Sequence, residues 1–134
     1  MNTHYLDSLP EVKNKYKVDL QPCEKVVFTA KPWGFSSDSG MMLGFDNSTV
    51  TMTNQRIIAD NGQGIWFTDI AEDIVDMRKV ETGKFLTKQV YILVTLNKEV
   101  TYGIGIQKLT GYQFHFHKKD MALFEDIIRH MNNS

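Results

Sequence analysis

Apolar and polar residues alternate along most of the chain with a period of two, the pattern of half-buried β-strands. The clearest case is residues 49–60, where Val50 and Met52 alternate with threonines and a second strand begins at Arg56. Between them lies Thr53-Asn54-Gln55, and Asn suits a tight reversal because it tolerates positive φ and can bond its own backbone. This segment therefore predicts a β-hairpin.

The same alternation predicts most of the remaining chain to be strands. They cover residues 24–30, 41–45, 65–67, 73–80, 89–96, 99–106 and 112–116. Residues 31–38 contain Pro32 and Gly34 followed by a polar run, which predicts a loop. Asn97-Lys98 predicts a turn between two strands.

Two segments have helical spacing instead. Met121, Phe124, Ile128 and Met131 recur every three to four residues, which predicts an amphipathic helix over Lys119–Asn132. Near the start of the chain, Ser8 and Glu11 have the spacing of a capping box, with Pro10 in the first turn. These residues predict a short helix over residues 8–16.

Four segments, taken in order, resemble the GRAM and bacterial pleckstrin-homology-like domains. They are the opening Leu20-Gln21-Pro22-Cys23-Glu24, the hairpin Thr53–Ile58, the segment Ile70–Met77 and the terminal helix. The resemblance implies a mainly β fold, a bent antiparallel sheet or barrel of about seven strands capped by the C-terminal helix. It places that domain at residues 20–134, after an N-terminal extension, residues 1–19, that holds the short helix.

Size and charge narrow the class of protein. A chain of 134 residues fits one domain, and a formal net charge of −1 gives no overall field that would attract nucleic acid or an anionic membrane. Cys23 is the single cysteine, so an internal disulfide is not possible. The first ten residues lack the basic and apolar regions of a secretory signal. We therefore expect a cytoplasmic protein that needs no cofactor and binds no nucleic acid.

Signatures of catalysis are missing from the sequence. It has no nucleophile elbow, no phosphate-binding loop and no His-Glu-x-x-His motif. His115 and His117 would lie on one face of a strand, where they could bind a metal or act as a base. Because no third ligand can be nominated, we interpret them as solvent-facing histidines opposite a buried Phe114/Phe116 face.

The most notable surface candidates are two aromatic residues, Trp33 and Phe35, on either side of Gly34. Exposed aromatic residues in a loop can anchor a partner or enter a membrane interface, and they can also cover the open end of a sheet. We expect them to form part of a self-association or partner contact.

Basic residues are the second group of candidates. Arg56 could contact a phosphate, although pairing with a strand carboxylate is the favoured interpretation. Four further cations surround residues 81–87: Arg78, Lys79, Lys84 and Lys88. Nearby acidic residues dilute this charge, so binding to phosphoinositide or other anionic membranes should be weak and removed by modest salt.

Together these features predict a non-catalytic intracellular binding or scaffold domain for a protein partner or a membrane-associated ligand. A protein partner is favoured, because the bacterial relatives in the resembled family are scaffolds and the charge balance does not favour an anionic membrane. The alternatives are a small β-barrel enzyme with His115 or His117 as base, and a lipid carrier with a large dry cavity.

Overall fold

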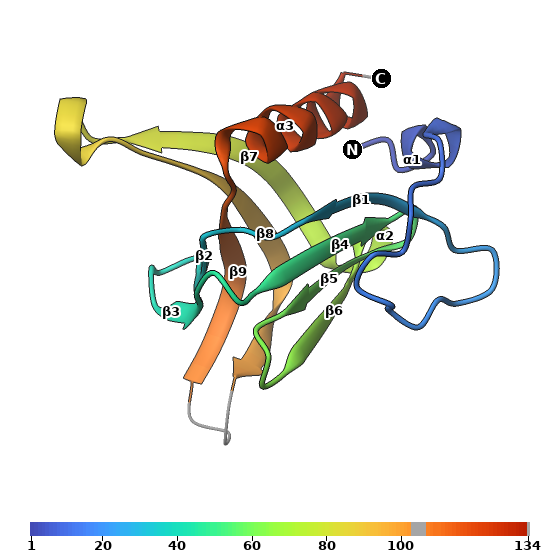
Figure 1. Cartoon of the computed structure of the whole chain (residues 1–134), viewed down its shortest axis with the longest axis horizontal. Helices are drawn as coiled ribbons and strands as arrows, with labels where there is room; N and C mark the ends of the chain where they lie inside the picture. The colour runs from blue at the N-terminus through green and yellow to red at the C-terminus, as the bar shows by residue number, and fades with distance from the viewer. Residues whose placement is uncertain (103–106, 134) are drawn as a thin grey trace.

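Two antiparallel sheets and one long helix make up the protein. The computed structural model describes residues 1–102 and 107–133 (Figure 1). Within these residues, one sheet has four strands, in the order β1 (Val26–Ala30), β4 (Thr49–Thr53), β5 (Arg56–Asp60) and β6 (Ile65–Asp69). The other sheet has five, in the order β3 (Met42–Gly44), β2 (Gly34–Ser37), β9 (Gln107–His115), β8 (Gln89–Tyr102) and β7 (Ile74–Thr82).

Short helical turns connect the strands, and one long helix follows them. The turns are α1 (Tyr5–Ser8), α2 (Ile70–Asp73) and the 3-10 turn η1 (Phe85–Thr87). The long helix, α3 (Lys118–Asn132), lies across one end of the two sheets (Figure 1). The predicted architecture, a mainly β fold closed by a C-terminal helix, is confirmed. The described residues form nine strands rather than about seven; β3 lies within the predicted strand at residues 41–45, and β2 was not predicted.

The core lies between the sheets and α3. Phe124 of α3 is fully buried, and its ring centroid is 5.1 Å from that of Phe28 on β1 and 5.2 Å from that of Phe116. Burial of the helix residues Met121, Ile128 and Met131 confirms the predicted apolar stripe. Alternating side chains of β8 and β9, among them Ile92, Val94, Tyr112 and Phe114, belong to the same core.

The predicted helix over residues 8–16 is wrong. The chain is helical earlier, at Tyr5–Ser8, and Leu9 already has extended φ and ψ angles. The physical reason is Pro10, because a residue that precedes proline is driven from helical to extended conformations. Leu6 is nevertheless fully buried in the core, with Tyr5 and Leu9 packed against it, while the domain boundary at residue 20 stays a prediction.

The predicted loop over residues 31–38 is also wrong in its second half. Gly34–Ser37 forms β2, which pairs along its whole length with β9, from Gly34 opposite His115 to Ser37 opposite Tyr112. Phe35 is 1% exposed and packs on the rings of Phe114 and Trp66. Phe35 is therefore a core residue, and its assignment to a surface contact is wrong.

The predicted turn at Asn97-Lys98 does not occur. Strand β8 continues through these residues to Tyr102, and an irregularity in its pairing with β9 lies between Thr95 and Val100. The side chain of Asn97 instead donates a hydrogen bond of 2.6 Å to the carbonyl of Glu72. The rest of the predicted strand, residues 103–106, lies outside the described residues.

Candidate binding groove

Arg56 is held in a buried ion pair. Its Nε and Nη2 atoms each donate a hydrogen bond of 2.8 Å to a different carboxylate oxygen of Glu24, whose side chain is fully buried. Nη2 also donates to the carbonyl of Asp19, and the guanidinium carbon lies 5.0 Å from the ring centroid of Phe67. The structural interpretation of Arg56 is therefore confirmed: this side chain joins the chain before β1 to β5.

The pair also changes the acidity of both groups. Burial by itself would raise the pKa of Glu24, but hydrogen bonds from Arg56 and Thr53 outweigh it, and the pKa is lowered. The hydrogen bond to Glu24 raises the pKa of Arg56. Both groups are charged at neutral pH, and each neutralises the charge of the other.

A groove of about 610 Å³ runs between the first half of α3 and the β7–β8 hairpin. Its floor is apolar, made by Val90, Phe116, Met121 and Ala122. Trp33 also lines the groove, and its charged rim consists of Lys79, Lys88, Lys118 and Glu125. The structure thus brings together three of the predicted site residues, Trp33, Lys79 and Lys88, from segments that are far apart in the sequence.

Trp33 is held in place while much of its indole faces solvent. Its backbone N–H donates a hydrogen bond of 3.0 Å to the carbonyl of His115, and its ring lies 4.8 Å from the imidazole, centroid to centroid. The residue is nevertheless 46% exposed. A large aromatic side chain that is both fixed and open is well suited to a contact, because little rotamer freedom remains to be lost on binding.

The rim charges form a short chain of ion pairs. Lys79 Nζ lies 2.8 Å from a carboxylate oxygen of Glu125 on α3 and 3.5 Å from one of Glu81, and Lys88 Nζ lies 3.4 Å from the other oxygen of Glu81. The hydrogen bond to Glu125 raises the pKa of Lys79, and that from Lys88 lowers the pKa of Glu81. Lys118 forms no ion pair with any described residue, so it is the least engaged cation of the rim.

The other two predicted cations lie elsewhere on the hairpin. Lys84 precedes η1 at the tip, far from the groove floor, and is exposed. Arg78 alternates with Lys79 along β7, and its Nε lies 3.6 Å from a carboxylate oxygen of Asp76. The predicted cluster is therefore divided between the groove, the tip and a separate hollow beside α3 that Arg78 lines.

His115 and His117 have different surroundings. His115 is only 6% exposed, so its interpretation as solvent-facing is wrong: Trp33 and Tyr91 cover its ring. Burial lowers the pKa of His115, which keeps the imidazole neutral at pH 7. Its Nε2 lies 3.1 Å from the amide oxygen of Gln113, whereas His117 is exposed just before α3. Among the described residues, no group of three His, Cys, Asp or Glu side chains is placed to hold a metal ion.

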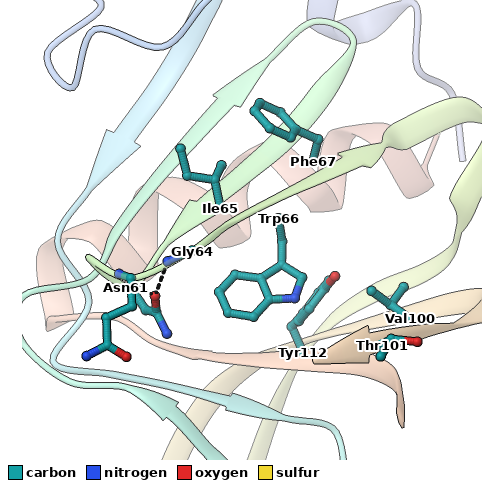
Figure 2. A pocket seen from close by; sticks show the side chains of 9 residues that line it. Asn61, Gly64, Ile65, Trp66, Phe67, Val100, Thr101 and Tyr112 are labelled. Atoms are coloured by element: carbon teal, nitrogen blue, oxygen red, sulfur yellow. Dashed lines mark hydrogen bonds between the residues drawn. The ribbon is translucent and has the colours of Figure 1, made fainter. Parts of the chain in front are cut away.

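A second hollow, of about 490 Å³, opens beside β6 (Figure 2). Trp66 and Tyr112 point toward each other in it, while Ile65 and Phe67 point away. The amide of Asn61 is committed to the turn that borders the hollow, because its oxygen accepts from Gly64 N–H at 2.8 Å and its nitrogen donates to Leu43. The described lining residues carry no charge, which makes this hollow a weaker candidate for a charged ligand.

Comparison with known proteins bears on the fold. No family model matches this sequence, and no curated protein is significantly similar to it. Among solved structures, the Vps36 N-terminal PH domain is similar, with a TM-score of 0.61 and 18% sequence identity, over 93% of this chain and 92% of that chain. The fold is therefore pleckstrin-homology-like, while the GRAM resemblance stays a prediction. Within the described residues, no helix is both long and apolar enough to cross a membrane.

Sequence reasoning did not find the floor of the groove or Lys118. Val90, Phe116 and Met121 each read as core positions of their own element, and they are at most partly exposed. Nothing local marks them as neighbours, since the floor exists only where β8, β9 and α3 meet. Phe85 and Leu86 did carry a signal, because two adjacent apolar residues between Lys84 and Lys88 are unusual in a polar turn.

Proposed function

We propose that this domain is a non-catalytic binding module that holds a segment of a protein partner in the groove beside Trp33. The observation that carries the proposal is the groove itself: an open apolar floor, a fixed and half-exposed indole, and a lysine rim. Indoles are among the residues that most often dominate the binding energy of protein interfaces. A cytoplasmic location, predicted from the sequence, is part of the same proposal.

The chemistry of the groove suggests the kind of segment it would take. Apolar side chains of the partner would cover Val90 and Met121, and an acidic side chain would pair with Lys118 or Lys88. Because Lys79 already pairs with Glu125, it contributes more to the shape of the rim than to recognition. The expected ligand is therefore a short apolar segment with at least one carboxylate.

The surroundings of the histidines give the enzyme alternative less support. A histidine base in a catalytic site needs access to substrate and a group that orients it. His115 is covered by two aromatic rings and faces Gln113 rather than a carboxylate. The lipid-carrier alternative needs a large dry cavity, whereas the apolar side chains between the sheets pack on one another.

Affinity capture from the native cell tests the proposal with two groove variants and one matched control. Trp33→Ala and Lys118→Glu should each lower recovery of a bound partner at least about tenfold, as expected for a central interface residue. Lys13→Glu changes the charge equally at an exposed position outside the groove and should leave recovery unchanged. All three proteins should show the melting temperature of a folded domain. Equal recovery by wild type and both groove variants would contradict the proposal.

A further inference from the structure

The tip of the β7–β8 hairpin presents two apolar side chains to solvent. Phe85 is 96% exposed and Leu86 is 103% exposed. Figure 1 shows that this turn, drawn in yellow, lies at the far end of the hairpin, away from α3 and from both sheets' packed faces. Single exposed apolar residues are common, but an adjacent aromatic and aliphatic pair at a projecting tip is not explained by folding.

Two residues of this turn have left-handed backbone conformations. Phe85 has φ of +51°, a left-handed conformation that is uncommon for a bulky residue. Thr87 stabilises the turn, since its hydroxyl donates to the carbonyl of Lys84 at 2.9 Å. Gly83 has φ of +78°, and a Cβ there would collide with the carbonyl oxygen of Thr87. Backbone strain of this kind is often retained at ligand-contacting positions.

Positive charge flanks the apolar pair. Lys84 and Lys88 lie on either side of it, and residues 82–90 include no acidic residue. Lys84 forms no ion pair with any described residue, while Lys88 is paired with Glu81 at the base of the tip. The tip therefore combines two exposed apolar side chains with two flanking lysines, Lys84 and Lys88.

The size and charge of the tip favour one kind of binding surface over the others. Two side chains bury far less than the roughly 800 Å² per partner of a stable protein interface. A second copy of this chain would bring the lysines of two tips together, which is unfavourable. An anionic bilayer interface matches both features, because apolar side chains enter the headgroup boundary while lysines stay at the phosphate level.

We propose that the tip of the β7–β8 hairpin, Gly83 to Lys88, docks into the interface of an anionic lipid membrane. The contact is shallow and not specific for one headgroup, because the tip has no pocket. It goes beyond the proposed function, since it uses neither Trp33 nor the groove floor. Such a weak contact would raise the local concentration of the domain at a membrane rather than anchor it alone.

A dye at the tip gives the most direct test. In a Cys23→Ser background, the single thiol of Phe85→Cys is labelled with an environment-sensitive dye; a Phe45→Cys protein, labelled in the same way, is the matched control, because Phe45 is 62% exposed on another turn. Vesicles of phosphatidylcholine with about one-third phosphatidylserine should raise and blue-shift the emission at position 85 only. Neutral vesicles should give a much smaller response.

Sedimentation with the same vesicles supplies the second measurement. Phe85→Ser/Leu86→Ser should lower the partition constant at least about tenfold, and Phe45→Ser should not. Lys84→Gln/Lys88→Gln should remove the preference for anionic vesicles, and added salt should act in the same direction. Equal dye response at positions 85 and 45, equal binding to neutral and anionic vesicles, or loss of a dimer by light scattering in the Phe85/Leu86 variant would overturn the proposal.

Discussion

The environment of a charged side chain, rather than its type, decides what it does in this protein. Arg56 and Lys118 are both cations next to strands or helices, yet Arg56 has two hydrogen bonds to a buried carboxylate and Lys118 has no ion pair within the described part of the chain. A buried pair that loses one partner leaves an uncompensated charge, which is costly. Arg56 therefore stabilises the fold, whereas the ammonium group of Lys118 is available to bind a ligand.

Replacement of Glu24 should show this coupling in the pH dependence of stability. The folded pKa of Glu24 is lowered, so the carboxylate stabilises the fold above its unfolded pKa of about 4.3, and that stabilisation is lost as the pH falls through the folded value. Glu24→Gln should lower the free energy of unfolding at pH 7 by on the order of 3 kcal/mol. Urea unfolding at several pH values provides the measurement.

The matched control is Glu11→Gln, which removes an exposed carboxylate. Below the unfolded pKa, the gap between wild type and Glu24→Gln should narrow, while Glu11→Gln follows wild type throughout. Parallel pH curves for wild type and Glu24→Gln would show that the pair does not couple to folding.

Among the strands and helices, α3 closes the core. Its residue Phe124 is fully buried between Phe28 and Phe116, at ring-centroid distances of 5.1 and 5.2 Å. The same helix contributes Met121 and Ala122 to the groove floor, so its position fixes the groove as well as the core. Stability of the helix docking and integrity of the groove should therefore change together.

Phe124→Ala measures how much the docking of α3 contributes. Loss of a fully buried phenylalanine should lower the free energy of unfolding by about 3–5 kcal/mol, because both transfer and cavity terms apply. Leu123→Ala, at a neighbouring helix position that is 51% exposed, is the control and should change stability far less. A loss below about 1 kcal/mol in Phe124→Ala would mean that the helix is not part of the core.

Period-two and helical patterns predicted the elements that have one buried face. They failed at β2, where all four residues Gly34–Ser37 are buried and no alternation remains. Glycine and serine resemble a loop locally, and only the pairing with β9, nearly eighty residues later in the chain, makes them a strand. The predicted turn at Asn97-Lys98 failed for the opposite reason: these residues are polar and exposed, as in a turn, yet they continue strand β8.

Across the whole molecule, both proposed surfaces use the β7–β8 hairpin. Its base lines the groove through Lys79, Lys88 and Val90, and its tip carries Phe85 and Leu86. Sequence reasoning named some of these residues but could not group them, since the groove combines segments near residues 33, 90 and 120. The net charge of −1 describes the whole chain and therefore gives no sign of the two lysines that flank the tip.

The central claim is that a protein partner occupies the groove, and photo-cross-linking in the native cell tests it most directly. A photoreactive phenylalanine replaces Gln89, an exposed residue that lines the groove, or Phe45 as a control outside it. Position 89 should give a discrete adduct with another protein that disappears when Lys118→Glu is added, and position 45 should not give it. The same adducts from both positions, or none from position 89, would contradict the account.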